Sequence, residues 1–127
     1  MKKEIAEQWA AELRSGKYKQ GAAYLKYENC YCCLGVLCEI SNISNFEETS
    51  FEDVDRIDAD EYFGCNTELP NEVMEWSGMR NEVGDFLDVA IKSELRLNKY
   101  TSLTAANDSG VSFLEIADFI EKHWEEL

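Results

Sequence analysis

The first fifteen residues carry apolar side chains at a helical spacing. Ile5, Trp9 and Leu13 recur every four residues, which places them along one side of a helix. Gly16 follows and suits the position just beyond a helix C-terminus, where a left-handed backbone is common. The pattern predicts an amphipathic helix over residues 3–15.

The end of the chain repeats this pattern with a clearer start signal. Ser112 and Glu115 stand three residues apart, as the two members of a capping box do. The apolar face that follows consists of Phe113, Ile116, Ala117 and Ile120. The sequence therefore predicts a last helix that runs to Trp124, preceded by a short helix over 102–108 that ends at 109–110.

Between these ends the pattern changes from alternating to continuously apolar. Residues 22–27 and 30–32 suit two short antiparallel strands joined by a two-residue turn at 28–29. Residues 33–40 fit either a central strand or a buried helix. We favour the helix, because four residues share one helical face and Asn42 can end it. The four are Leu34, Leu37, Cys38 and Ser41.

The middle of the chain is less regular. Residues 42–69 are rich in polar and acidic side chains, and we expect a short strand at 62–64. Pro70 suits the start of a helix. Helical spacing returns over 81–97, although Gly84 weakens its start and a strand within this region is an alternative.

These elements predict an α+β fold: a single compact domain over 1–127, with four to five helices packed on a small antiparallel hairpin or sheet. No run approaches the ~18 apolar residues that a membrane span needs. The N-terminus lacks the apolar stretch of a signal peptide. Five cysteines without an export signal predict reduced thiols and a cytoplasmic location.

The charge of the chain is strongly negative and unevenly distributed. The net charge is −14, from 12 Lys and Arg against 26 Asp and Glu. Residues 39–94 hold sixteen of the acidic residues and only three basic ones, whereas residues 1–38 have six basic and four acidic residues. Such a surface repels phosphate backbones and anionic membranes, and it attracts basic protein surfaces. Acidity can serve solubility alone, but this clustering favours a role in binding.

The cysteines and the single histidine form no recognisable catalytic or metal site. Four cysteines fall in one apolar run, at Cys30, Cys32, Cys33 and Cys38. Zinc sites use two well-separated pairs, but Cys65 stands alone. Buried cysteine behaves as a small hydrophobe, and the one potential base, His123, lies far along the chain on the solvent side of the last helix. We therefore expect no enzyme, no metal and no cofactor.

Two polar segments remain as candidate sites. Acidic residues recur over 53–61, but an EF-hand loop needs glycine at its sixth position, where Asp58 stands. Residues 14–21 contain three cations, two hydroxyls and an amide around two glycines. This polar cluster could hold an anionic ligand, or it could be a solvated connection with a loop at 17–21.

Three strings carry a resemblance to a known group of proteins. They are LRSGKYKQG at 13–21, YCCLGVLCE at 31–39 and ND-x-G-x-SF-x-EIAD-x-IE at 107–121, with LP at 69–70 and a following Trp76 between the last two. With them, the chain resembles small uncharacterised proteins encoded by tailed bacteriophages and prophages. The resemblance covers both ends and leaves the acidic middle, roughly 42–68, unmatched. It implies a phage accessory protein in the bacterial cytoplasm, a class rich in inhibitors of host defence, and it carries over no functional residues.

Our first hypothesis is an inhibitor that acts by binding. An ordered acidic surface would imitate DNA and block the basic groove of a host nucleic-acid-binding protein, with no direct binding to nucleic acid or membrane. The expected partner-binding residues are Glu47, Glu48, Glu52, Asp53, Asp55, Asp58, Asp60 and Glu61. We lean to this hypothesis because the clustering of negative charge can be counted directly in the sequence, whereas the chemistry of a ligand cannot be read from it.

The second hypothesis is a ligand-binding protein that sequesters a small anionic signal, such as a host defence nucleotide. Its contacts would come from the polar cluster: Arg14, Lys17, Tyr18 and Gln20. A virion or morphogenesis component is a third possibility. The sequence leaves the oligomeric state, the target and the ligand open.

Overall fold

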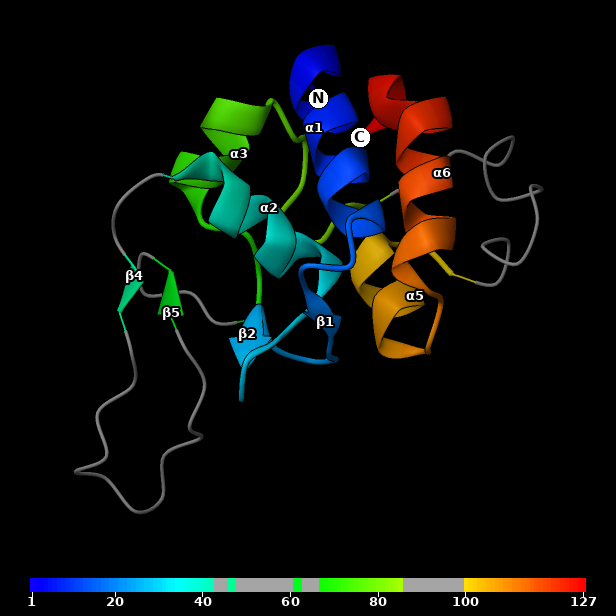
Figure 1. Ribbon diagram of the computed structural model, residues 1–127. Coiled ribbons are helices and arrows are strands. Elements are labelled where there is room, and N and C mark those ends of the chain that lie inside the picture. The colour runs from blue at the N-terminus through cyan, green and yellow to red at the C-terminus, as the bar shows by residue number, and fades with distance from the viewer. Residues whose placement is uncertain (43–45, 48–60, 63–66, 86–99) are drawn as a thin grey trace.

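Helices packed around α1 form most of the part of the chain that the structure describes. The computed structural model describes residues 1–42, 46–47, 61–62, 67–85 and 100–127. In chain order the elements are α1 (Lys3–Arg14), β1 (Lys19–Gln20), β2 (Lys26–Tyr27), β3 (Cys30–Tyr31), α2 (Cys33–Ser41), β4 (Phe46–Glu47), β5 (Glu61–Tyr62), α3 (Asn71–Ser77), α5 (Leu103–Asp108), α6 (Phe113–His123) and a 3₁₀ turn (Trp124–Glu126). Figure 1 shows α1 beside α6, with α2 crossing next to α1 and α3 against α2. The result is a compact α+β fold, as the sequence predicted.

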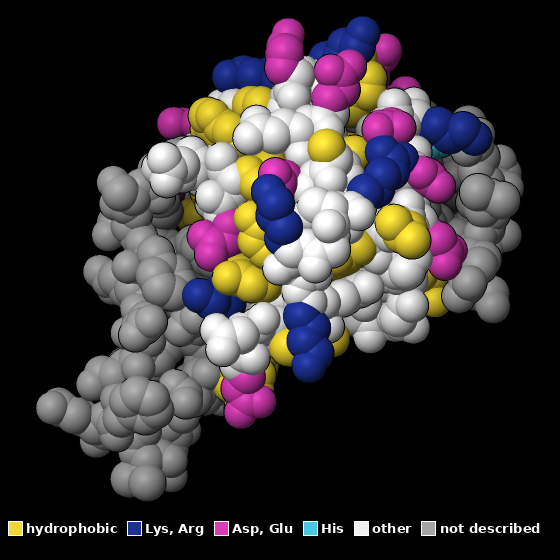
Figure 2. Space-filling view, viewed as in Figure 1, with side chains coloured by type: hydrophobic (Ala, Val, Ile, Leu, Met, Phe, Trp, Pro, Cys, Tyr) yellow, Lys and Arg dark blue, Asp and Glu magenta, His cyan; other side chains and the backbone are white. Residues whose placement is uncertain are grey.

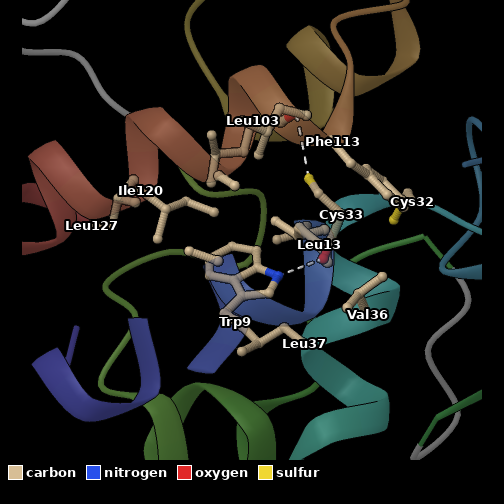
Figure 3. Packing of buried hydrophobic residues seen from close by; sticks show 14 of the residues in the cluster. Trp9, Leu13, Cys32, Cys33, Val36, Leu37, Leu103, Phe113, Ile120 and Leu127 are labelled. Atoms are coloured by element: carbon tan, nitrogen blue, oxygen red, sulfur yellow. Dashed lines mark hydrogen bonds between the residues drawn. The ribbon is translucent and has the colours of Figure 1, made fainter. Parts of the chain in front are cut away.

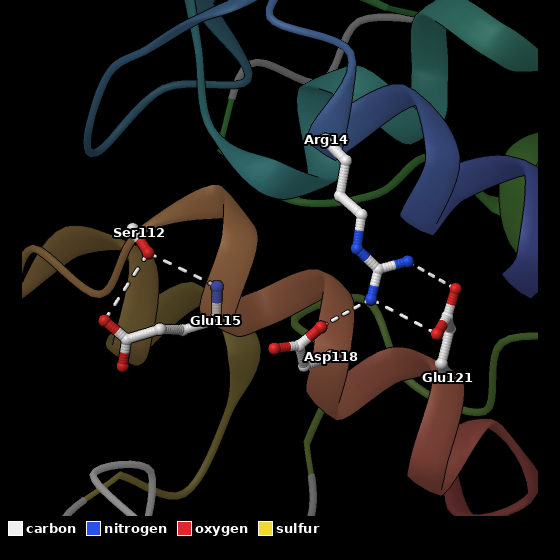
Figure 4. Close-up of polar contacts among 5 residues, drawn as sticks. All are labelled: Arg14, Ser112, Glu115, Asp118 and Glu121. Atoms are coloured by element: carbon white, nitrogen blue, oxygen red, sulfur yellow. Dashed lines mark hydrogen bonds and ion pairs between the residues drawn. The ribbon is translucent and has the colours of Figure 1, made fainter.

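The helix boundaries follow the local signals in the sequence. α1 ends just before Gly16, whose φ is +78°, and α2 ends at Asn42, whose φ is +50°. At the start of α6 the Ser112 hydroxyl accepts a hydrogen bond from the Glu115 N–H at 3.3 Å, which confirms the N-cap half of the predicted capping box (Figure 4). The Ser112 hydroxyl donates in turn to the Glu115 carboxylate at 3.4 Å. None of the helices in the described ranges is long and apolar enough to cross a membrane.

The predicted hairpin is present, but it belongs to a mixed sheet. β2 and β3 pair antiparallel, and both turn residues have a positive φ, +50° at Glu28 and +63° at Asn29. That is the type I′ arrangement, which matches the twist of a two-residue hairpin. β1 then pairs with β3 in parallel, so the predicted loop at 17–21 contains a short strand. The sequence did not predict this strand, because a two-residue strand is held by backbone hydrogen bonds and is too short to show an alternation of apolar and polar side chains.

A close approach between the hairpin and α2 explains one glycine. A Cβ at position 35 would lie 1.8 Å from the carbonyl oxygen of Leu25. Leu25 is fully buried, and its carbonyl accepts the Cys32 N–H at 3.3 Å. Gly35 therefore lets the hairpin reach the start of α2, which fixes the position of the small sheet.

The helix expected over 81–97 is wrong at its start. Residues 81–84 form a turn in which the Val83 N–H donates to the Asn81 side chain at 2.9 Å, and Asp85 forms an isolated bridge with Ser102. Gly84 has a φ of +67°, and a Cβ there would lie 3.0 Å from the Leu103 side chain. The glycine that weakened the helical pattern thus lies in a left-handed turn instead of a helix. The remainder of this predicted helix lies outside the described residues.

The core forms where α1, α2, α5 and α6 meet. Trp9 is fully buried, and its indole N–H donates to the Cys33 carbonyl at 2.9 Å (Figure 3). The apolar faces predicted for the first and last helices, including Leu13 and Ile120, point into this core. Burying side chains of this size contributes ~1.5–3 kcal/mol each, so these helices dominate the stability of the fold.

The two ends of the chain lie together. The Met1 ammonium donates to the Trp124 carbonyl at 3.1 Å, and the Leu127 N–H donates to the same oxygen at 3.2 Å. The loop after α3 joins them, because the Arg80 N–H donates to the Leu127 carbonyl at 2.8 Å. Partial burial lowers the pKa of the Met1 ammonium, with a further contribution from the nearby Arg80 charge.

Candidate interaction surface

Arg14, the first residue of the predicted polar cluster, is paired within the chain. Its guanidinium contacts two carboxylates on α6: Asp118 at 2.5 Å, and Glu121 through both carboxylate oxygens (Figure 4). These hydrogen bonds raise the pKa of Arg14 above its ordinary value. With two negative charges on one cation, this site has no positive charge left to attract an anionic ligand.

Lys17 and Tyr18 also have internal contacts. The Lys17 ammonium lies 3.4 Å from the Glu12 carboxylate, at an exposed position. The Tyr18 ring packs edge-to-face on Tyr31 with 5.1 Å between ring centroids. Burial raises the pKa of Tyr18, helped by the negative charges of Glu12 and Glu39. These two residues thus connect the end of α1 to the sheet.

Gln20 reaches from β1 to the segment between α5 and α6. Its Nε2 donates to the Asn107 side-chain oxygen at 2.9 Å and to the Val111 carbonyl at 2.7 Å. Its Oε1 accepts the Phe113 N–H at 3.2 Å. Phe113 is the first residue of α6, so Gln20 satisfies one of the N–H groups that a helix start leaves open.

Asn107 satisfies the first backbone N–H of α2 in the same way. Its Oδ1 accepts the Cys33 N–H at 3.2 Å, and its Nδ2 donates to the Gly21 carbonyl at 2.8 Å. The side chain is buried, with Asn107 only 2% exposed. Together Gln20 and Asn107 form a polar junction, here called the Gln20–Asn107 junction, that closes two helix N-termini and joins the first and last recognisable strings of the sequence.

This arrangement weighs against the second hypothesis. Helix N-termini bind anions because their N–H groups are free, but at α2 and α6 the first N–H donates to an amide side chain. Three of the four proposed ligand contacts, Arg14, Lys17 and Gln20, have hydrogen-bonding or ionic partners inside the chain. The polar cluster is best explained as a structural connection.

The cysteines near α2 are packed into the core. The Cys32 sulfur accepts the Gly35 N–H at 3.4 Å and so caps α2, as serine often does. Burial raises the pKa of Cys32 to about 11, and it holds the pKa of Cys33 well above its ordinary value. Such thiols are poor nucleophiles at neutral pH. In the described ranges no group of His, Cys, Asp and Glu could hold a metal ion, while Cys65 lies outside these ranges.

His123 lies in the last turn of α6. It is half-buried, and its ring lies 4.9 Å from the Phe119 ring, centroid to centroid. The sequence had placed it on the solvent side of the helix. The imidazole is partly exposed there and packs along the helix against Phe119, one turn earlier.

Most of the acidic residues proposed for partner binding lie outside the described residues: Glu48, Glu52, Asp53, Asp55, Asp58 and Asp60. The other two belong to the β4–β5 ladder. Glu47 and Glu61 are antiparallel register partners there, next to the pair Phe46 and Tyr62. The ladder brings together the two ends of the acidic segment.

A second group of acidic residues, which the sequence reasoning missed, surrounds α3. Glu72 and Glu75 lie one turn apart on this helix, and both are exposed. The Leu69 N–H donates to the Glu82 carbonyl at 2.9 Å, so the segments that carry Glu68 and Glu82 run side by side. Both of these glutamates are exposed too. We call Glu68, Glu72, Glu75 and Glu82 the α3 acidic surface.

These four glutamates have no ion pair with any cation in the described part of the chain. On the face drawn in Figure 2 the Lys and Arg side chains lie among Asp and Glu side chains. One signal could have identified the α3 acidic surface beforehand. The spacing of Glu72 and Glu75 on a helix that begins after Pro70 puts both on its polar side.

Residues 1–124 match the family model described as Domain of unknown function (DUF8296), which covers nearly the whole chain. The chain therefore belongs to this family. No curated protein and no solved structure matches it.

Proposed function

We propose that this protein is a phage accessory protein of the anti-defence type that acts by binding in the bacterial cytoplasm. Its acidic surface would occupy the basic groove of a host nucleic-acid-binding protein, in the manner of a DNA mimic. The observation that carries the proposal is the distribution of charge. Residues 39–94 hold sixteen acidic residues against three basic ones, and the four glutamates of the α3 acidic surface lack internal ion pairs among the described residues.

Electrostatics explains why such a surface would select a DNA-binding partner. Duplex DNA presents about one negative charge per 1.7 Å of its axis, so a basic groove that holds it carries many closely spaced cations. Exposed carboxylates on an ordered helix and its flanking loops offer the same sign of charge at fixed positions. Complementary potentials of this kind accelerate association and suppress wrong partners.

The first test is a competition experiment at several salt concentrations. Basic DNA-binding proteins and defence nucleases would be mixed with a fluorescent DNA duplex, and this protein would be added as competitor. We expect displacement of the duplex from at least one of them, with an affinity that falls by about tenfold or more between 0.1 and 0.4 M salt, because screening weakens exposed charges. An affinity that persists unchanged at high salt would refute the mimicry.

The second test locates the surface. One variant carries Glu68→Gln, Glu72→Gln, Glu75→Gln and Glu82→Gln, and a second carries Asp53→Asn, Asp55→Asn, Asp58→Asn and Asp60→Asn. The matched control removes the same number of charges at exposed positions elsewhere, through Glu4→Gln, Glu7→Gln, Glu28→Gln and Glu125→Gln. We expect the first two variants to lose at least tenfold in competition and the control to lose much less. Equal losses in all three would mean that net charge alone drives binding.

A further inference from the structure

The segment that links β1 to the hairpin is strained. Ala23 has a φ of +71°, in the left-handed region that L side chains rarely adopt. The Tyr24 N–H donates to the Ala22 carbonyl at 2.9 Å, which closes a three-residue γ-turn around Ala23. A γ-turn with a positive central φ is rare and strained. Ala22 and Ala23 are exposed, so side-chain burial does not hold the turn in place.

Both ends of this segment are firmly anchored. On one side, Gln20 is fixed by three hydrogen bonds in the Gln20–Asn107 junction. On the other side, Leu25 is fully buried in the core. Gly21 belongs to the first anchor, because its N–H donates to the Tyr31 carbonyl at 2.7 Å and its carbonyl accepts from Asn107 at 2.8 Å. The three residues 22–24 can change conformation without removing either anchor.

The contact that holds Ala23 comes from the end of α5. The Asp108 carboxylate accepts the Ala23 N–H at 2.9 Å and lies 3.4 Å from the Asn107 Nδ2. Asp108 is exposed, so water competes for this hydrogen bond. An exposed contact therefore opposes the backbone strain.

We propose that residues 22–24 form a strained strap that Asp108 latches, and that the strap opens as a local unit while α1, α2 and α6 stay folded. Opening relieves the strain at Ala23. It breaks the contact between the Tyr24 and Tyr27 rings, whose centroids lie 5.5 Å apart, but it costs little of the buried core, because Leu25 keeps its place. Segments with few buried contacts and exposed hydrogen bonds are the ones that open below the global free energy of unfolding. Strain that persists in a fold needs such a contact to maintain it.

Amide hydrogen exchange measures this opening directly. The Tyr24 amide reports on the strap, and the Cys33 amide, which donates to Asn107, reports on the helical core. In Asp108→Ala we expect exchange at Tyr24 to become about tenfold faster, while exchange at Cys33 stays within twofold of the unmodified protein. Asp108→Asn keeps an acceptor oxygen and should remain close to the unmodified protein.

A second substitution separates release of strain from simple loss of a hydrogen bond. Ala23→Gly removes the penalty for the positive φ. In the Asp108→Ala background it should restore most of the lost protection at Tyr24. The proposal is overturned by unchanged exchange at Tyr24 in Asp108→Ala, by an equal acceleration at Cys33, or by faster exchange at Tyr24 in Ala23→Gly.

Discussion

The Gln20–Asn107 junction and the α3 acidic surface both consist of polar residues, but their partners differ. In the junction the two amide side chains bond to each other and to the backbone of four elements or loops. On the α3 acidic surface four glutamates face solvent and have no ion pair within the described ranges. The difference teaches that a distinctive polar string can serve the fold, whereas unpaired charges of one sign are better candidates for contact with a partner.

The largest effect that tests this difference is expected from Asn107→Ala. The substitution leaves the Cys33 N–H without its partner in a buried place and the Gly21 carbonyl without its partner in a partly buried one. Since each unsatisfied buried group costs ~1–3 kcal/mol, we expect a loss of about 3 kcal/mol in the free energy of unfolding. Urea denaturation followed by circular dichroism measures this, with exposed Asn71→Ala as the control. A loss below ~1 kcal/mol would contradict a structural junction.

Alkaline pH should produce the next largest effect, because the junction accepts the backbone N–H of Cys33, and the thiols of Cys32 and Cys33 are buried. The folded-state pKa of Cys32, about 11, exceeds the ordinary value of 9.0. The thiol therefore ionises less readily in the folded state than in the unfolded state. Its contribution to the free energy of unfolding is fully present below pH 9 and is lost as the pH rises towards 11. We expect the free energy of unfolding to fall by roughly 1–2 kcal/mol between pH 8.5 and 10.5.

The control for this pH effect is Cys32→Ser, which keeps an oxygen to cap α2 and removes one titrating thiol. Tyrosines and lysines titrate in both proteins, so the difference between the two pH profiles isolates the thiol. Its profile should be shallower. Identical profiles would show that the buried thiol does not contribute.

A smaller effect is expected from Arg14→Ala, because Arg14 has charged partners within the chain but lies at an exposed position. Arg14 pairs with Asp118 and Glu121, but all three side chains are partly or largely exposed, at 32%, 71% and 46%. Exposed pairs contribute ~0.2–1 kcal/mol, so we expect a loss of that size in low salt that disappears in 1 M salt. Lys17→Ala, which removes one longer pair, should cost less in the same denaturation experiment. A salt-independent loss would point to packing of the Arg14 side chain instead.

The smallest effect on stability is expected from the four substitutions of the α3 acidic surface. Because these glutamates have no ion pair in the part of the chain that the structure describes, Glu→Gln at all four should change the free energy of unfolding by less than ~0.5 kcal/mol. The same variant should lose at least tenfold in the competition with DNA. A clear loss of stability would show that the surface is structural, like the junction.

The sequence predicted well those parts of the fold that depend on local signals. Gly16, Asn42 and Ser112 mark helix boundaries through their own backbone preferences or side-chain caps, and all three do so in the structure. The hairpin turn followed from its position between two short strands. These signals act within a few residues, so they can be detected without knowing the fold.

The candidate site was harder to predict, because its contacts join distant parts of the chain. Gln20 and Asn107 are 87 residues apart, and Arg14 and Glu121 are 107 apart. A sequence shows that Arg14 and Gln20 are polar but not whether a carboxylate or an open helix end lies beside them. The α3 acidic surface was missed for the same reason, since its two flanking segments are distant in sequence and come together through the Leu69–Glu82 hydrogen bond.

The meeting of Met1 and Leu127 at one carbonyl has a practical consequence. Since both N–H donors reach the Trp124 oxygen, a few glycines could bridge the termini without disturbing the helices. New ends could then be opened in the exposed turn at Ser109–Gly110. A circular permutant of this kind would move any attached fluorophore or affinity label from the joined termini to the turn between α5 and α6, at the opposite end of α6 (Figure 1).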